Sequence, residues 1–283
     1  MAGLQRAMQA RRLIQINAVF GTGPILGLPH ASHTPMSSLI ARRIALVTGA
    51  SSGIGAAICR QLVEEGCQAI AADVNLDGAR AVALSLGERV QPVMLDVSDP
   101  DAVASCIAQI VQRHGRLDLA VNNAGVAGIG LDTGEYPLDE WHRVLGVNLH
   151  GVFYCMKYQL KAMQAQGGGV IVNMASMLGP DACWGGSAAY VAARHALVGM
   201  TKSAAHEHAS HGIRINAVGP GFIQTSTPAA IKTDEYAAMV GLHPGGRLGN
   251  ASEVAELTCF LLSERASFIN GSYYVIDGGY SAR

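Results

Sequence analysis

From residue 43 onward the chain alternates short apolar runs with longer stretches of helical periodicity, and no other feature constrains its fold as strongly. The runs are rich in Val, Ile and Ala without apolar–polar alternation, which is typical of parallel strands buried on both faces. Because parallel strands need helical crossovers, the alternation predicts an α/β fold: a single doubly wound sheet of about seven parallel strands with helices on both faces. The expected strands are Ile44–Thr48, Gln68–Asp73, Val90–Asp96, Leu117–Asn122, Gly169–Ala175, Arg214–Val218 and Ser272–Ile276.

Helical spacing fills the segments between these strands. A chain of 283 residues suits one large α/β domain, and no internal repeat or linker divides it. We therefore expect one domain over residues 43–283. The expected helices are Ala56–Glu65, Pro100–His114, Leu138–Gln164, Ala188–His211 and Ser252–Leu262.

The first 42 residues differ from the rest in charge. They contain arginines but no acidic residue, and the first acid in the chain is Glu64. We expect residues 1–42 to be an N-terminal extension outside the domain, either disordered or the product of an upstream start, with Met36 as a natural alternative start. A mitochondrial transit peptide is the alternative, since such leaders are rich in Arg and poor in acids.

Composition excludes several classes of function. A net charge of −1 with 14% charged residues gives no basic surface for nucleic acid. No apolar stretch reaches about 18 residues, so we expect no membrane span. The six cysteines have no paired spacing, which favours reduced thiols and a cytoplasmic protein. His206, His208 and His211 do not share one helix face, so we expect no metal site.

A glycine-rich turn joins the first expected strand to the first helix, where Thr48–Gly55 reads T-G-A-S-S-G-I-G. Glycines let the backbone approach a pyrophosphate, and a helix N-terminus offers it N–H groups and a positive dipole. Asp73 ends the second strand, 18 residues after Gly55. A carboxylate there binds the adenosine ribose hydroxyls and repels a 2′-phosphate. The pattern favours NAD(H) over NADP(H).

Further motifs follow in a definite order. They are N-N-A-G at 122–125, Asn148, Ser176, Tyr190 and P-G at 220–221. Together with the glycine turn, they make residues 40–283 resemble the short-chain dehydrogenase/reductase family. The resemblance implies a Rossmann-type fold, a homotetramer or homodimer, and hydride transfer between a nicotinamide cofactor and an alcohol or ketone.

The same resemblance implies catalytic roles. Tyr190 is the expected acid/base, Ser176 the residue that holds the substrate oxygen, and Asn148 the residue that bends its helix and positions a water. A phenol can exchange a proton near neutral pH only if positive charge lowers its pKa from about 10. The family has lysine four residues after the tyrosine, whereas this chain has Arg194. Arginine keeps the charge on the same helix face but is bulkier and relays no proton, so we expect reduced rather than absent activity.

The resemblance also assigns the cofactor site to the strand ends and to the loop after the sixth strand. In that loop the backbone near Ile223 and the hydroxyl of Thr225 are expected to hold the nicotinamide carboxamide, and residues 224–249 to form a lid over the substrate. The expected cofactor-binding residues are Gly49, Ser51, Ser52, Gly53, Ile54, Gly55, Asp73, Asp96, Val97, Asn123, Ala124, Gly125, Tyr190, Arg194, Pro220, Gly221, Ile223 and Thr225.

These observations predict an NAD(H)-dependent oxidoreductase for a small-molecule secondary alcohol or ketone. Met177, Cys183 and Trp184 suit a cyclic or aliphatic substrate. Two alternatives remain open. One is a 3-oxoacyl-carrier-protein reductase, which Asp73 opposes because that activity usually implies NADP(H). The other is a degenerate NAD-binding scaffold or sensor, for which Arg194 is the only support.

Overall fold

The structure is a computed structural model that describes residues 42–180, 185–225 and 233–282. All of these residues belong to one unit, Met36–Arg283. Within the described ranges, no helix is long and apolar enough to cross a membrane.

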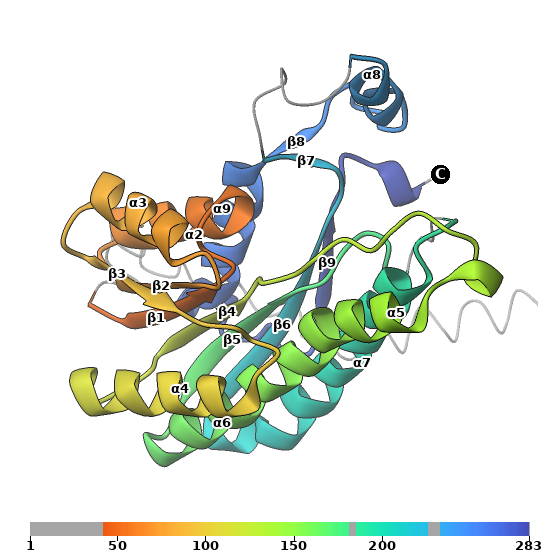
Figure 1. Ribbon diagram of the computed structural model, residues 1–283. Helices are drawn as coiled ribbons and strands as arrows, with labels where there is room; N and C mark the ends of the chain where they lie inside the picture. Colours follow the sequence, from red (N-terminus) through yellow and green to blue (C-terminus); the bar gives the residue numbers. More distant parts are fainter. Residues whose placement is uncertain (1–41, 181–184, 226–232, 283) are drawn as a thin grey trace, which may run out of the picture. The chain divides into compact units, whose positions relative to one another are not determined.

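Seven parallel strands form the central sheet, in the order β3-β2-β1-β4-β5-β6-β9 (Figure 1). This arrangement confirms the predicted doubly wound fold. The order reverses beside β1, which pairs with both β2 and β4. In such sheets ligands bind outside the carboxyl ends of the strands at this reversal. The strands are β1 (Ile44–Thr48), β2 (Gln68–Asp73), β3 (Val90–Met94), β4 (Leu119–Asn122), β5 (Gly169–Met174), β6 (Ile213–Pro220) and β9 (Tyr273–Ile276).

Helices cover both faces of the sheet (Figure 1). One face carries α2 (Gly53–Glu64), α3 (Leu76–Leu86) and α9 (Ala251–Leu262), and the other carries α4 (Pro100–His114), α5 (Leu138–Leu145), α6 (Val152–Ala165) and α7 (Ala188–His208). Successive strand residues enter opposite cores: in β1, Leu46 packs toward α4, α6 and α7, whereas Val47 packs toward α2 and α9. Burial on both faces explains why the strands read as continuous apolar runs.

The predicted helix Leu138–Gln164 is wrong as a single helix. The structure divides it into α5, a π-helical segment η3 (Gly146–Gly151) and α6. A π-helical turn contains about one residue more than an α-helical turn. Over only six residues this change does not visibly alter the periodicity of apolar residues, so the sequence pattern could not reveal it. The bend places Asn148 inside the molecule, where its side chain is fully buried.

Smaller differences concern the ends of elements and the lid. The third strand ends at Met94 rather than Asp96, because pairing with β2 stops there. The last three residues of the predicted helix Ala188–His211 form a 3-10 turn, η4 (Ala209–His211). The predicted lid contains α8 (Thr233–Gly241), and the short strands β7 (Ile223–Gln224) and β8 (Gly249–Asn250) pair at its two ends. Three further 3-10 turns are η2 (Thr133–Glu135), η6 (Glu264–Ala266) and η7 (Tyr280–Ala282).

Candidate active site

The glycine-rich turn lies against the N-N-A-G segment at the carboxyl edge of the sheet. Gly49 has φ +65°, and a Cβ on it would lie 2.8 Å from the Cα of Ala124. The Thr48 hydroxyl accepts hydrogen bonds from the backbone N–H groups of Asn123 and Ala124, at 3.0 and 3.1 Å. The Asn123 amide in return donates to the carbonyl of Thr48 at 3.0 Å. Only glycine fits this contact, which leaves the N-terminus of α2 open for an anion.

Asp73 stands at the end of β2 beside the glycine turn. One carboxylate oxygen accepts the backbone N–H of Ser51 at 2.9 Å, and the other accepts that of Asn75 at 2.8 Å. Each oxygen keeps a second lone pair. The carboxylate is therefore fixed in orientation and can still accept hydrogen bonds from a diol.

A cavity of about 510 Å³ opens next to the turn and holds the predicted catalytic residues Ser176, Tyr190 and Arg194. Seven of the predicted cofactor residues also line it: Ile54, Asn123, Gly125, Pro220, Gly221, Ile223 and Thr225. The structure thus brings the ends of β4, β5 and β6 together with α7 around one space. Asp73 and Asp96 lie at the same edge of the sheet, beyond this cavity.

Tyr190 projects from α7 toward Ser176, which follows β5 and is buried. Burial alone would raise the pKa of the Tyr190 phenol. The positive charge of Arg194 and hydrogen bonds with Ser176 and Arg194 outweigh burial, so the pKa lies below its ordinary value. A phenol with a lowered pKa beside a hydroxyl is suited to general acid–base chemistry on an alcohol oxygen.

Arg194 is buried beneath Tyr190, with only 4% of its surface exposed. Its Nη1 donates to the carbonyl of Met174 at 2.8 Å, and the guanidinium carbon lies 5.0 Å from the centre of the Tyr190 ring. Nη2 packs so closely on Gly125 that any side chain there would collide with it. Its Nε is buried without a hydrogen-bond partner within the described part of the chain. The guanidinium therefore lies between Gly125, in the segment that follows β4, and the Met174 carbonyl at the end of β5.

Asn148 fixes the segment that follows N-N-A-G. Its Oδ1 accepts the backbone N–H of Val126, and its Nδ2 donates to the carbonyl of the same residue, both at 2.8 Å. Val126 lines the cavity. The π-helical segment thus fixes the position of Val126, one of the residues that line the cavity.

Comparison with known proteins gives consistent results. The family model described as Enoyl-(Acyl carrier protein) reductase matches residues 49–281. The chain is 43% identical over 251 residues to cyclohexanol dehydrogenase of Acinetobacter sp. (strain SE19), covering 88% of this chain and 98% of that protein. It is 42% identical over 250 residues to cis-4-hydroxycyclohexanecarboxylate dehydrogenase of Sinomonas cyclohexanicum, covering 87% and 100%. The crystal structure of a short-chain type dehydrogenase/reductase from Mycobacterium marinum aligns with a TM-score of 0.81 at 35% identity, covering 88% and 98%.

The chain belongs to the short-chain dehydrogenase/reductase family. This result confirms the family and the fold predicted from the motifs. The two relatives also support the main functional prediction, an oxidoreductase for a secondary alcohol or ketone, over the carrier-protein alternative.

Several cavity residues of this short-chain dehydrogenase were not predicted. Their signals were present in the sequence: most follow the N-N-A-G motif, surround Ser176 or precede Tyr190, so chain proximity to the motifs could have indicated them. They are Val126, Ala127, Gly128, Met174, Ala175, Leu178, Ser187 and Phe222.

Other predicted residues are placed away from the cavity or are not described. Val97 packs against Gly151 of the π-helical segment, and the Asp96 carboxylate accepts hydrogen bonds from Ser98. Cys183, Trp184 and the lid residues 226–232 lie outside the described residues. The roles assigned to them from sequence stay predictions.

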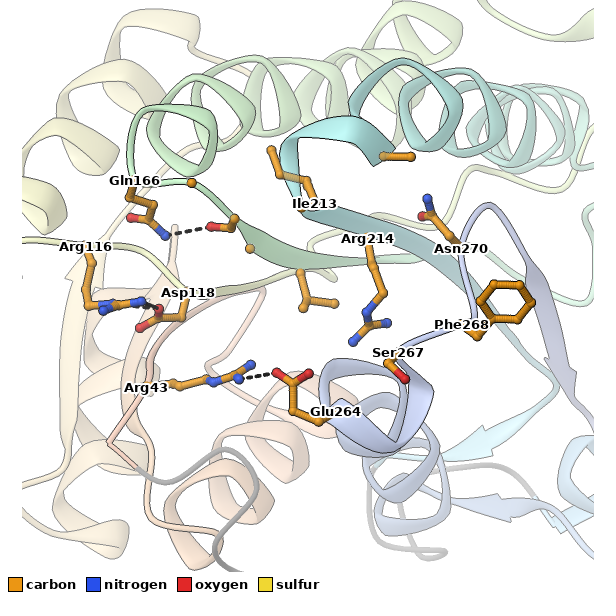
Figure 2. Close-up of a pocket in the computed structure, with 16 residues that line it drawn as sticks. Arg43, Arg116, Asp118, Gln166, Ile213, Arg214, Glu264, Ser267, Phe268 and Asn270 are labelled. Carbon is orange, nitrogen blue, oxygen red and sulfur yellow. Dashed lines mark hydrogen bonds and ion pairs between the residues drawn. The ribbon is translucent and has the colours of Figure 1, made fainter.

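A second, larger cavity of about 680 Å³ lies at the opposite, amino edge of the sheet (Figure 2). Its charged side chains are satisfied within the protein. Arg43 pairs with Glu264 and Arg116 with Asp118. Arg214 donates to the carbonyls of Leu261 and Ser263 at the end of α9, both at 2.9 Å. None of the predicted catalytic residues lines this cavity, so the smaller cavity is the candidate active site of this family member.

Proposed function

We propose that this protein is an NAD(H)-dependent dehydrogenase that interconverts a secondary alcohol and its ketone at the cavity around Tyr190. The observation that carries the proposal is the Tyr190 phenol, which lies between the Ser176 hydroxyl and the Arg194 guanidinium and has a lowered pKa. A phenol without a cation beside it would stay protonated at neutral pH.

The residues around the glycine turn fit a dinucleotide cofactor. The helix α2 begins at Gly53 with no side chain capping its first N–H groups, so they are available to a pyrophosphate. The oriented carboxylate of Asp73 supports NAD(H), because it would accept ribose hydroxyls and repel a 2′-phosphate. The unpartnered Arg194 Nε, buried beside the cavity, would donate to a ribose hydroxyl of the bound cofactor. When bound, the nicotinamide accepts or donates the hydride.

The chain's own residues supply the proton chemistry. In alcohol oxidation the unprotonated Tyr190 oxygen takes the hydroxyl proton of the substrate, and in ketone reduction the protonated phenol returns it. The Ser176 hydroxyl holds the substrate oxygen. Arg194 stabilises the phenolate electrostatically throughout and transfers no proton, because its own pKa lies too far above neutrality.

A saturated six-membered ring alcohol is the substrate class that the relatives support best. One relative is a cyclohexanol dehydrogenase and the other acts on a hydroxycyclohexanecarboxylate. The substrate side of the cavity offers the apolar side chains of Met177, Leu178 and Phe222. A carrier-protein substrate is less well supported, because Asp73 disfavours the NADP(H) that this activity usually implies.

We further propose a cytoplasmic homo-oligomer. Five described cysteines are free and buried, which suits a reducing compartment. Phe153 on α6 is half exposed, and β9 is an edge strand of the sheet, so both offer surface to a second copy. Size-exclusion chromatography with light scattering tests this part of the proposal, which a purely monomeric protein would contradict.

The decisive experiment is a turnover assay with cyclohexanol and a panel of other secondary alcohols at alkaline pH, following NADH absorbance. We expect turnover with NAD⁺ and a much lower rate with NADP⁺. Tyr190→Phe should lower kcat by about 10²–10⁴-fold while NADH binding persists. Binding of NADH without turnover of any alcohol in the panel would support the scaffold alternative and overturn the proposal.

A further inference from the structure

Tyr273 connects the last strand of the sheet to the loop that carries Ser176. It is the first residue of β9, and its hydroxyl donates a hydrogen bond of 2.6 Å to the backbone carbonyl of Ser176. The two residues are 97 positions apart in the chain. β9 pairs with β6 and β6 with β5, so the phenol must cross the end of β6 to reach the loop after β5.

Gly219 makes this crossing possible, and Gly179 lies close to the bond at its end. A Cβ on Gly219 of β6 would collide with the Tyr273 phenol. A Cβ on Gly179 would lie 2.9 Å from the Ser176 carbonyl oxygen and 3.4 Å from the Tyr273 hydroxyl. The phenol therefore occupies a space that only glycine at position 219 leaves open, while Gly179 lets the chain pass close to the Ser176 carbonyl that the phenol bonds.

Two backbone hydrogen bonds to β6 hold the residues on either side of Ser176. The backbone N–H of Ala175 donates to the Val218 carbonyl at 2.7 Å. The backbone N–H of Met177 donates to the Pro220 carbonyl at 2.9 Å. The Ser176 hydroxyl accepts the N–H of Leu178 at 3.2 Å, a contact inside the loop. The bond from Tyr273 thus acts directly on the peptide group of the residue whose hydroxyl faces Tyr190.

We propose that Tyr273 is a positioning residue for catalysis, which holds the Ser176 backbone so that the serine hydroxyl stays within hydrogen-bond reach of Tyr190 and the substrate oxygen. This inference rests on the proposed roles of Ser176 and Tyr190. Tyr273 does not line the cavity around Tyr190, so its proposed action passes through Ser176.

The neighbouring Tyr274 provides a matched control. It is the next residue of the same strand, and the pleat turns it to the opposite face of the sheet: Tyr273 packs against the core beneath α6 and α7, and Tyr274 against the core beneath α9. Tyr274→Phe removes the same hydroxyl from the same edge strand without touching the Ser176 loop.

The experiment measures cyclohexanol oxidation with NAD⁺ as a function of pH for the wild type, Tyr273→Phe, Tyr274→Phe and Ser176→Ala. We expect Tyr273→Phe to lower kcat by about 3–10-fold, the typical effect of one hydrogen bond, and to leave the KM for NAD⁺ unchanged. The rising limb of kcat against pH for Tyr273→Phe should move to higher pH, because a displaced Ser176 hydroxyl stabilises the Tyr190 phenolate less well. Tyr274→Phe should match the wild type in kcat and in pH profile.

Two further variants keep the inference open to refutation. In the Ser176→Ala background, Tyr273→Phe should cause no additional loss, and Gly219→Ala, which displaces the phenol, should reproduce the Tyr273→Phe profile. Equal kcat and pH profiles for Tyr273→Phe and Tyr274→Phe would refute the positioning role. So would a double variant in which Tyr273→Phe lowers the kcat of Ser176→Ala by the same factor as it lowers the kcat of the wild type. If Ser176→Ala itself retained full activity, the proposed function of Ser176 would be wrong, and this inference with it.

Discussion

At the scale of single residues, the contact between Tyr190 and Arg194 lowers the pKa of the phenol in the candidate site. Burial opposes ionisation of the phenol, and only the adjacent guanidinium and the hydrogen bonds reverse that effect. A lysine in the same place would offer a compact, mobile ammonium group, whereas the guanidinium is held by Met174 and by close packing on Gly125. The site therefore has its positive charge at a fixed point below the ring.

Removing this charge should move the pH dependence of the enzyme in a defined direction. In the proposed mechanism alcohol oxidation needs the unprotonated Tyr190, so activity should be present above the pKa of Tyr190 and be lost as the pH falls through it. In Arg194→Met burial acts unopposed by the charge, the pKa of Tyr190 rises, and the rising limb of kcat against pH should shift to the alkaline side. An unchanged profile would show that the guanidinium does not set the pKa.

Arg194→Lys tests whether arginine limits turnover. The substitution keeps the charge and replaces the bulky, planar guanidinium with a compact ammonium group that can relay a proton, so we expect kcat with NAD⁺ to rise and the pH profile to stay close to that of the wild type. If kcat does not rise, arginine belongs to the mechanism of this enzyme, and the expectation of reduced activity is wrong.

Among helices, the π-helical segment has the clearest effect on the site. Asn148→Ala removes both hydrogen bonds to Val126 and leaves its partly buried backbone groups without this partner, so we expect a loss of about 1–2 kcal/mol in the free energy of unfolding. Because Val126 lines the cavity, kcat should fall as well. Urea denaturation and the turnover assay measure the two effects.

Asn270→Ala is the matched control for this change. Asn270 also bonds two backbone groups, accepting from the N–H of Ile215 and donating to the carbonyl of Ala205, but it lies at the amino edge of the sheet. We expect it to lower stability and leave kcat of the folded protein unchanged. A similar loss of kcat in both variants would mean that Asn148 acts through stability alone.

A carboxylate at the start of α9 makes a contribution to the stability of the fold that depends on pH. Arg247 and the backbone N–H of Asn250 hydrogen-bond the Glu253 carboxylate and lower its pKa from 4.5 to about 2. A lowered carboxylate pKa stabilises the fold above 4.5, and this contribution disappears as the pH falls through about 2. Glu253→Gln should therefore cost about 0.5–1 kcal/mol at neutral pH, since both side chains are partly in solvent.

The measurement is the difference in unfolding free energy between wild type and Glu253→Gln from pH 7 to pH 3. The difference should narrow below pH 4.5, while Glu256→Gln, an exposed position on the same helix, should show a small difference at every pH. A difference in unfolding free energy between the wild type and Glu253→Gln that stayed constant from pH 7 to pH 3 would contradict the lowered pKa of Glu253.

For the whole molecule, the folded unit is expected to work without the N-terminal extension. β1, the glycine turn and the ion pair of Arg43 with Glu264 all lie beyond Met36. We expect a chain that starts at Met36 to keep the unfolding midpoint and kcat of the full chain. A chain that starts at Ala50 lacks β1 and should not fold. A large loss of activity in the Met36 chain would assign a role to the extension.

Much of this molecule was predictable from sequence because its signals are local. Buried parallel strands such as Gln68–Asp73 appear as continuous apolar runs, and the glycine turn and Tyr190 belong to motifs. α3 was not among the predicted helices, and Ala79 is its only fully buried residue. The bond from Tyr273 to Ser176 could not be predicted, since it depends on the order of β5, β6 and β9.

That bond also has a consequence for biosynthesis. Because β9 follows the other strands of the sheet in the chain, the proposed anchor of the serine loop is synthesised after Ser176, Tyr190 and Arg194. A nascent chain can already contain the glycine turn, Ser176, Tyr190 and Arg194 while its serine is still unanchored. A product truncated before Tyr273 would retain every family motif from the glycine turn to P-G yet lack the proposed anchor.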